Sequence, residues 1–414
     1  MSVAIKTVRL GDPEVSEVFL GQSPPSATYN EHREGLPFYQ GKADFGLVHP
    51  TPRVWCRQGS KFAKPNDVLI SVRAPVGDVN MATEDAVIGR GVSAIRAAEG
   101  VDPWYLYFAL GFMKPALEAQ ATGSTFASVN GATLRDLQIP LVPFEDQTAI
   151  SRTLRLLLTQ LQGEERALES AAETKAAAMQ RLFSQGLRDE PQKETEIGQI
   201  PEGWELATID KHFSVTSGGT PSRGNDSYWV GGTIPWVKTT EVNYSVITET
   251  AEHITQAGLD GSAAKMLGTG TLLMAMYGQG VTRGKVGILG IEASCNQACA
   301  AMTPTDDDVL PRYLYHFLTS RYEAIRLLAH GGQQQNLNLD IVRKIDVPVP
   351  STTDEQQEIV DVLDALDRKI DLHRRKRDVI GQLFKSLLHK LMTGEVSVDD
   401  LDVSALSTLE GSTA

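Results

Sequence analysis

The residues that could perform chemistry do not form a known catalytic motif. The sequence has no G-x-x-x-x-G-K-[ST] loop for nucleotide phosphates and no H-E-x-x-H helix for zinc. The Asn/Asp-Pro-Pro-Tyr/Phe signature of amino-methyltransferases is also absent, since the only Pro-Pro pair lies in Ser23-Pro24-Pro25-Ser26. The glycines of Gly278-Gln279-Gly280 and Gly284 have the wrong spacing for a phosphate loop and predict a turn between strands. We therefore expect a chain that is not an enzyme.

Metal ligands are equally sparse. Cys295 and Cys299 have a four-residue spacing that suits a metal site, but no second Cys or His pair follows, so we favour two buried thiols. Asp306-Asp307-Asp308 could belong to a nuclease cluster, yet its polar surroundings indicate a solvated turn. The histidines are scattered without ligand spacing. We predict no bound metal.

A long-period internal repeat organises the rest of the chain. Two copies of about 200 residues follow one another, and insertions in loops would explain why the offset between them grows. Each copy predicts short strands, a helix (Trp104 to Ala119, Arg312 to Leu328), a polar loop, a Pro-closed strand and a final long helix. The matched segments are Gly21-Ser23-Pro24 with Gly218-Thr220-Pro221, Pro37-Phe38 with Pro235-Trp236, Val68-Leu69-Ile70 with Thr271-Leu272-Leu273, Pro103 to Tyr107 with Pro311 to Tyr315, Ile139-Pro140 with Val347-Pro348, and Gln147 and Ile150 with Gln356 and Ile359.

The two final helices carry a heptad pattern. Apolar residues recur at steps of four and three from Ile150 to Leu182 and from Ile359 to Leu391. Such a seam predicts a coiled coil, although a lone amphipathic helix packed on each domain is the alternative. At ~1.5 Å per residue, each seam would extend roughly 50 Å and hold two domains at a fixed distance.

Polar residues interrupt both seams and bear on helix direction. With full overlap, antiparallel pairing places Glu164 at the level of Arg377. Parallel pairing would place Glu164 against His373 and leave Arg377 opposite the apolar Leu168. Charge matching therefore predicts an antiparallel pair whose register is set by Glu164 and Arg377.

Composition limits the class of protein and its location. The chain has 414 residues and 41% hydrophobic content, enough for two or more domains. No run of 18 apolar residues suggests a membrane span, and residues 1–10 lack a signal-peptide layout. Three cysteines fit a reducing compartment, so we expect a cytoplasmic protein.

The net charge of −13 is unusual for a protein that binds DNA. No long segment is basic, and the acid excess is greatest in residues 354–414. Nucleic-acid binding would need cations gathered on one face, or partner subunits that supply most phosphate contacts.

The sequence resembles the specificity subunits of type I restriction-modification enzymes over about residues 6–398. The motifs that carry the resemblance are short, but their order and the duplication are specific. They are Val8-Arg9-Leu10-Gly11-Asp12, Leu20 to Pro25, Gly35 to Lys42, Thr195-Glu196-Ile197-Gly198, Ile200 to Glu205, Ser217 to Pro221, Ile234-Pro235-Trp236 and Leu391 to Val396.

The resemblance implies a non-catalytic DNA-specificity subunit with an α+β fold and a pseudo-twofold internal repeat. Two globular target-recognition domains would be joined by two long helices in an antiparallel coiled coil. Two methyltransferase subunits, expected to carry S-adenosylmethionine, would bind the helices, and motor-nuclease subunits would join for cleavage; this chain itself would bind no cofactor. The predicted domains are 1–145, first recognition domain; 146–200, first spacer helix and linker; 201–353, second recognition domain; 354–394, second spacer helix; and 395–414, a flexible tail.

Polar and basic residues in turn-rich segments are the candidates for contact with double-stranded DNA, because Arg and Lys bind guanine edges or phosphate and Gln can pair with adenine. Each is otherwise an ordinary surface residue. In the first copy these are Gln22, Ser23, Tyr29, Gln40, Lys42, Arg73 and Arg90. In the second they are Thr220, Ser222, Arg223, Lys238, Thr239, Tyr277, Gln279 and Arg283. The matched loops Ser124-Thr125 and Gln333-Gln334-Gln335 could approach the DNA backbone or only cap helix packing.

Two other functions remain as alternatives. A protein-protein adaptor with two heads on a coiled coil and no DNA contact would fit the acidic charge. A standalone nuclease or methyltransferase is disfavoured by the missing motifs. Gel shifts of the chain, alone and with a methyltransferase partner, would distinguish these functions.

Overall fold

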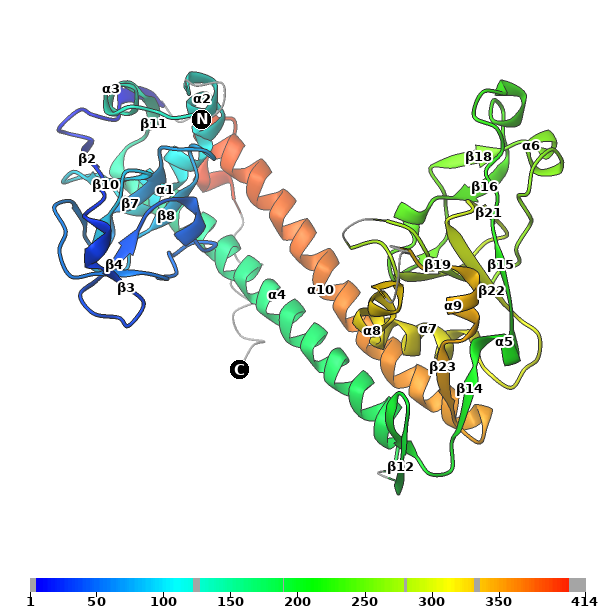
Figure 1. The fold of residues 1–414 in the computed structure, drawn as a ribbon. Helices are drawn as coiled ribbons and strands as arrows, with labels where there is room; N and C mark the ends of the chain where they lie inside the picture. Colours follow the sequence, from blue (N-terminus) through cyan, green and yellow to red (C-terminus); the bar gives the residue numbers. More distant parts are fainter. Residues whose placement is uncertain (1–4, 122–126, 189, 279–280, 331–335, 402–414) are drawn as a thin grey trace. The chain divides into compact units, whose positions relative to one another are not determined.

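The computed structural model describes residues 5–121, 127–188, 190–278, 281–330 and 336–401 (Figure 1). The chain forms two compact units, one of Met1–Ala167 with His373–Ala414 and one of Leu168–Leu372. Each unit contains a part of both long helices, so this division does not test the narrower domain limits 1–145 and 201–353, which stay predictions. Of the predicted tail 395–414, only residues 395–401 are described, and Val398 and Leu401 pack against the core of the first unit.

The first unit combines three small sheets with short helices. Its sheets have the strand orders β1-β11, β2-β10-β7-β8 and β3-β5-β4-β9-β6. The strands are β1 (Lys6–Arg9), β2 (Ser16–Leu20), β3 (Tyr29–Asn30), β4 (Leu36–Tyr39), β5 (Trp55–Cys56), β6 (Phe62–Ala63), β7 (Val68–Ser71), β8 (Val79–Met81), β9 (Ala86–Ile88), β10 (Val92–Ala97) and β11 (Gln138–Leu141). The helices are α1 (Pro103–Phe112), α2 (Lys114–Gln120) and α3 (Gly131–Asp136), with 3-10 turns η1 (Ser26–Thr28), η2 (Lys42–Asp44) and η6 (Val398–Asp400).

The second unit has a similar order of elements, with additional strands and helices. Its sheets are β12-β13, β14-β23, β15-β22-β19-β20-β17 and β18-β16-β21. The strands are β12 (Gln192–Thr195), β13 (Gly198–Pro201), β14 (Glu205–Thr208), β15 (Phe213–Ser217), β16 (Ile234–Val237), β17 (Val246–Ile247), β18 (Glu252–Ile254), β19 (Leu272–Ala275), β20 (Val286–Leu289), β21 (Ser294–Cys295), β22 (Cys299–Pro304) and β23 (Asp346–Val349). The helices are α5 (Ile209–His212), α6 (Gln256–Asp260), α7 (Pro311–Ser320), α8 (Tyr322–Leu327) and α9 (Leu339–Arg343), with 3-10 turns η3 (Asp226–Tyr228), η4 (Thr239–Glu241) and η5 (Leu328–His330). The predicted α+β class is confirmed.

Equivalent side-chain contacts support the repeat at atomic detail. The side-chain oxygen of Gln147 accepts a hydrogen bond from the backbone N–H of Asp102, and that of Gln356 accepts one from Leu310, both at 2.9 Å. The Tyr105 hydroxyl donates to the Pro140 carbonyl, and the Tyr313 hydroxyl donates to Pro348. Each buried polar group is thus satisfied in the same way in both units.

One predicted match is wrong by a single residue. The sequence alignment paired Val68 with Thr271, but the sheet registers pair Ser71 with Val92 in one unit and Ala275 with Cys299 in the other. Val68 therefore corresponds to Leu272, and both side chains face the main core of their own unit. A shift of one residue in the alignment of a strand exchanges the residues on its two faces. Because both strands are apolar on both faces, the hydrophobic pattern of the sequence does not reveal the shift.

The two long helices, α4 (Phe144–Gln185) and α10 (Thr353–Thr393), pair antiparallel in both units. In the first unit, Ile150 near the start of α4 shares a core with Leu391 near the end of α10. In the second unit, Leu182 near the end of α4 shares a core with Ile359 near the start of α10. The predicted direction is confirmed, and no helix in the described part of the chain has the length and apolar character needed to cross a bilayer.

Candidate nucleic-acid interface

In the first unit, the turn Gly89–Gly91 gathers most of the predicted contact residues. The Arg90 backbone N–H donates to the Ser23 hydroxyl (3.2 Å), and the Gly89 N–H donates to the Tyr39 carbonyl (2.8 Å). On the other side, the Val72 N–H donates to the Gly91 carbonyl (3.0 Å). These bonds draw the segments that carry Gln22, Ser23, Gln40, Arg73 and Arg90 around one turn.

Arg73 and Arg90 are the most available cations of this group. Both side chains are exposed, and within the described ranges neither forms an ion pair. Lys42 differs, because its ammonium lies 3.8 Å from Asp78, a carboxylate that also binds Lys114. An unpaired exposed guanidinium keeps its donors available for a base edge or a phosphate.

Tyr29 has a structural contact of its own. Its hydroxyl donates to the Pro24 carbonyl (2.8 Å), and its ring lies 4.7 Å from the Phe38 ring. Burial raises the pKa of this phenol, so it stays protonated. The hydroxyl is therefore already engaged in holding the segment after β2.

In the second unit, Arg223 and Lys238 meet at Glu252, a residue that the sequence did not single out. The Arg223 Nη1 lies 2.5 Å from Glu252 Oε2, and the Lys238 Nζ lies 2.9 Å from Glu252 Oε1. The Arg223 guanidinium also lies over the Trp229 ring, 3.8 Å from its centre. Glu252 comes next to Trp236 only through the pairing of β16 with β18, and sequence spacing carries no signal for it.

The neighbouring candidates hold this arrangement together. The Thr220 hydroxyl donates to the side-chain oxygen of Gln297, and the Ser222 carbonyl accepts a hydrogen bond from the Trp229 indole (3.0 Å). Thr239 begins η4, whose Glu241 accepts a bond from the Lys238 backbone N–H (2.7 Å). In the first unit, the Asp44 carboxylate accepts the equivalent hydrogen bond from the Gln40 backbone N–H (2.7 Å).

The remaining candidates lie on the connection between β19 and β20. Tyr277 is exposed there, and Arg283 is half-buried. Gln279 and the loops Ser124-Thr125 and Gln333-Gln334-Gln335 lie outside the described residues. The assignment of all these residues to DNA contact stays a prediction.

The predicted register pair Glu164–Arg377 is corrected by the structure. Glu164 Oε2 lies 2.6 Å from His373 Nδ1, whereas Arg377 binds Asp378 on its own helix (2.7 Å). The His373 side chain is 18% exposed and that of Arg377 is 35% exposed. Arg377, the more exposed of the two, keeps its permanently charged guanidinium in contact with solvent.

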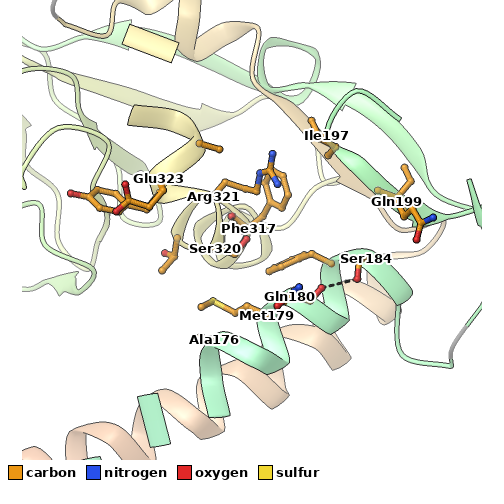
Figure 2. Close-up of a pocket in the computed structure, with 15 residues that line it drawn as sticks. Ala176, Met179, Gln180, Ser184, Ile197, Gln199, Phe317, Ser320, Arg321 and Glu323 are labelled. Carbon is orange, nitrogen blue, oxygen red and sulfur yellow. Dashed lines mark hydrogen bonds between the residues drawn. The ribbon is translucent and has the colours of Figure 1, made fainter. Parts of the chain in front are cut away.

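The second unit also contains a cavity of about 620 Å³ between α4, β13 and α7–α8 (Figure 2). Met179, Phe183 and Phe317 line it together with Arg321 and Glu323. Among the predicted DNA-contact residues that the structure describes, none lines this cavity. Its mixed apolar and charged lining does not resemble a basic surface for phosphate.

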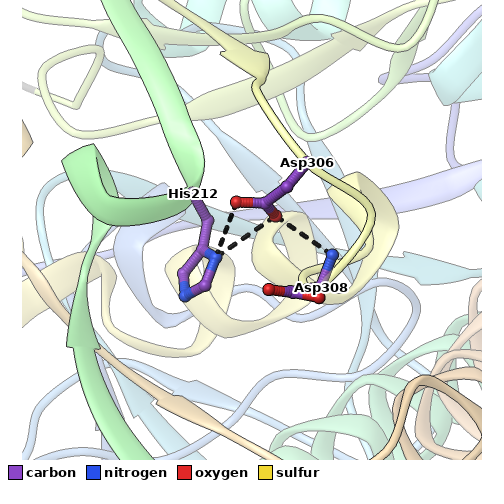
Figure 3. Close-up of side chains that lie close together, drawn as sticks. All are labelled: His212, Asp306 and Asp308. Atoms are coloured by element: carbon purple, nitrogen blue, oxygen red, sulfur yellow. Dashed lines mark hydrogen bonds and ion pairs between the residues drawn. The ribbon is translucent and has the colours of Figure 1, made fainter.

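His212, Asp306 and Asp308 form a cluster in the same unit (Figure 3). The Asp306 carboxylate lies 3.1 Å from His212 Nδ1 and accepts a hydrogen bond from the Asp308 backbone N–H (3.0 Å). These bonds anchor the loop after β22 to α5. Asp306 thus has a structural partner, and the predicted solvated turn is only partly solvated.

Comparison with known proteins gives a consistent family. The family model for the type I restriction modification DNA specificity domain matches residues 55–170 and 201–382. The chain is 36% identical over 184 residues to the MjaX type I restriction enzyme specificity subunit of Methanocaldococcus jannaschii, covering 44% of this chain but only 43% of that protein. It is 21% identical over 427 residues to the EcoBI specificity subunit of Escherichia coli, covering 96% and 88% of the two chains.

Solved structures share the fold. The S subunit of a type I restriction-modification system from M. genitalium has a TM-score of 0.66 and 16% identity, and the match covers 94% of this chain and 96% of that one. A second structure, from work on complex assembly and conformational transition of the type I system, has a TM-score of 0.56 and covers 95% and 99%.

Proposed function

Because the chain belongs to the family of type I restriction-modification DNA specificity subunits, we propose that it reads a two-part DNA target, with one half-site bound by each unit. The observation that carries this proposal is the repeat. The framework contacts of the two units are equivalent, whereas nearby side chains differ, such as the exposed Gln40 beside η2 and the half-buried Lys238 beside η4. Equivalent scaffolds with different surface chemistry suit two different half-sites.

The chain acts without an active site of its own and directs partner subunits in the cytoplasm. Two methyltransferase subunits bind S-adenosylmethionine and supply methyl transfer, and motor-nuclease subunits supply cleavage. The net charge of −13 supports this division, because partners that carry basic surfaces would provide phosphate contacts that this acidic chain lacks.

A gel-shift experiment tests the proposal against the adaptor alternative. The chain is mixed with duplexes of many sequences, alone and together with its methyltransferase partner. The proposal predicts a shift with the partner that is restricted to certain sequences. A partner complex that forms normally but binds no DNA, or binds all sequences equally, would favour the adaptor.

A further inference from the structure

The second unit contains a cluster of three charged side chains and one aromatic ring: Arg223, Lys238, Glu252 and Trp229. Arg223 is exposed and the other three are half-buried. The Arg223 guanidinium lies 3.8 Å from the centre of the Trp229 ring and 5.0 Å from that of Trp236. Stacking of a guanidinium on an aromatic ring restricts its orientation and leaves its edge donors exposed. The Arg223 side chain remains 53% exposed, so a ligand can reach those donors.

The surrounding bonds hold the cluster in place before any ligand arrives. The Trp229 indole donates to the Ser222 carbonyl (3.0 Å), and the Trp236 indole donates to the Gly219 carbonyl (2.9 Å). Glu252 binds both cations, and hydrogen bonds from Lys238 and Arg223 lower its pKa, so it is ionised at neutral pH. A preorganised donor and acceptor pair loses little entropy on binding.

The charge pattern disfavours a phosphate as the ligand. A phosphate site presents donors alone, whereas here a carboxylate lies 2.5 Å from Arg223 and 2.9 Å from Lys238. That carboxylate would repel a phosphate and neutralise half of the positive charge. The donors of Arg223 beside the acceptor oxygens of Glu252 instead match an uncharged ligand that presents hydrogen-bond acceptors next to a donor.

The major-groove edge of a G·C base pair has this pattern. Guanine presents two acceptors, N7 and O6, and cytosine presents the donor N4 amino group next to them. We infer that Arg223 and Glu252 together read one G·C base pair of the second half-site, with Arg223 donating to guanine and Glu252 accepting from cytosine. This inference rests on the proposed function, and Lys238 acts in it as a positioning residue that holds Glu252 (2.9 Å).

The first unit lacks this pair at the equivalent positions. Glu252 is opposite Trp236 in the β16–β18 register. In the first unit, the β4–β5 pairing places Val54 opposite Phe38, and the Phe38 N–H donates to the Val54 carbonyl. Val54 is thus the counterpart of Glu252. Gln40 occupies the position that corresponds to Lys238 of the second unit. Reading of a G·C pair by this Arg–Glu pair is therefore expected in the second half-site and not at the equivalent position of the first.

The test measures the binding of the chain, assembled with its methyltransferase partner, to its own target and to every single-base-pair variant of that target. For Arg223→Ala, the affinity for the target should fall about 5- to 150-fold, and the preference for one G·C pair should disappear. Glu252→Gln should weaken the preference at that same pair and leave the other positions unchanged. Glu205→Gln is the matched control, since Glu205 is an exposed carboxylate in the same unit that binds Lys211 instead.

The sign of the Glu252→Gln effect separates base reading from phosphate binding. At a phosphate site, loss of the carboxylate would raise the affinity for all sequences alike, and Arg223→Ala would lower the salt slope by about one. Either result would overturn the inference, as would an A·T pair at the position that Arg223 reads. A wild-type complex without any sequence preference would instead overturn the proposed function itself. Melting temperatures of each variant establish that the second unit is folded.

Discussion

Replacement of Asp364 by Asn tests how the second unit attaches its globular part to the long helices. Asp364 on α10 accepts hydrogen bonds from His316 Nε2 (2.8 Å) and Arg312 Nε (2.8 Å), both on α7. Nearby on α10, Asp367 binds Lys175 on α4 and lies 3.9 Å from Arg312. One charged network thus connects α7 with both long helices.

The pKa of Asp364 gives the size of the effect. Burial would raise this pKa, but hydrogen bonds from His316 and Arg312 outweigh burial and lower it from 3.8 to about 2. At ~1.4 kcal/mol per pKa unit, this lowering of the pKa means that the ionised carboxylate stabilises the folded unit by about 2 to 3 kcal/mol at neutral pH. The side chain is 25% exposed, so screening by solvent is limited.

Hydrogen exchange of the α7 and α10 peptides is the assay. Asp364→Asn should lower their protection by roughly 30- to 150-fold at pH 7, the equivalent of about 2 to 3 kcal/mol. A depressed carboxyl pKa stabilises the fold above pH ~4 and ceases to do so as the pH falls through about 2, so the difference from wild type should shrink over that range. Asp340→Asn, which removes an 81% exposed partner of Arg343, is the control and should change protection by less than ~0.5 kcal/mol. Equal effects of the two substitutions would refute the reasoning.

Three further predictions concern the two units and their helices. The Arg155 guanidinium lies 4.5 Å from the centre of the Trp104 ring. Trp104→Arg would place a second cation against it and should destabilise the first unit by at least about 1 kcal/mol in thermal melts, whereas Trp104→Phe keeps an aromatic ring there and should destabilise the unit less. Gly218→Ala should destabilise the second unit by at least about 2 kcal/mol in denaturant titrations, because an added Cβ would lie 2.1 Å from the Cys295 carbonyl; Gly224→Ala, with open space around it, should not. Insertion of seven residues after Ala172 and of seven after Gly381 should widen the gap in the DNA target by about three base pairs, as read from methylation maps. Insertion of four residues in only one helix should reduce methylation of the target, because it interrupts the heptad seam. Retention of the original gap by the seven-residue pair would show that the helices do not set the spacing.

The repeat and the long helices were predictable because both depend on sequence periodicity. The heptad steps from Ile150 and Ile359 follow the burial of one helix face, which the structure reproduces at Ile150, Leu154, Ile359 and Leu363. Helix direction was predicted correctly from charge matching, although the supposed partner was wrong. Glu164 contacts His373, which lies one turn before Arg377 on α10, while Arg377 binds Asp378. Heptad counting gives the level of a residue along the helix pair but not which neighbouring side chain it contacts.

The candidate site was only partly predictable. Arg223 and Lys238 were recognised as cations in turn-rich segments, but their common partner Glu252 lies on a strand that reaches them through sheet pairing. Likewise, the turn that joins Ser23 to Arg90 depends on contacts 67 residues apart. Strands of two to six residues carry too little pattern to fix such pairings in advance.

The exchange of one recognition domain tests the central proposal most directly. Residues 1–145 are replaced by the corresponding domain of another specificity subunit, and the methylated sites are mapped by long-read sequencing in cells that express the partner subunits. Independent reading by two units predicts that one half of the methylated sequence changes, while the other half and the gap stay the same. Alteration of both halves at once would contradict the proposal.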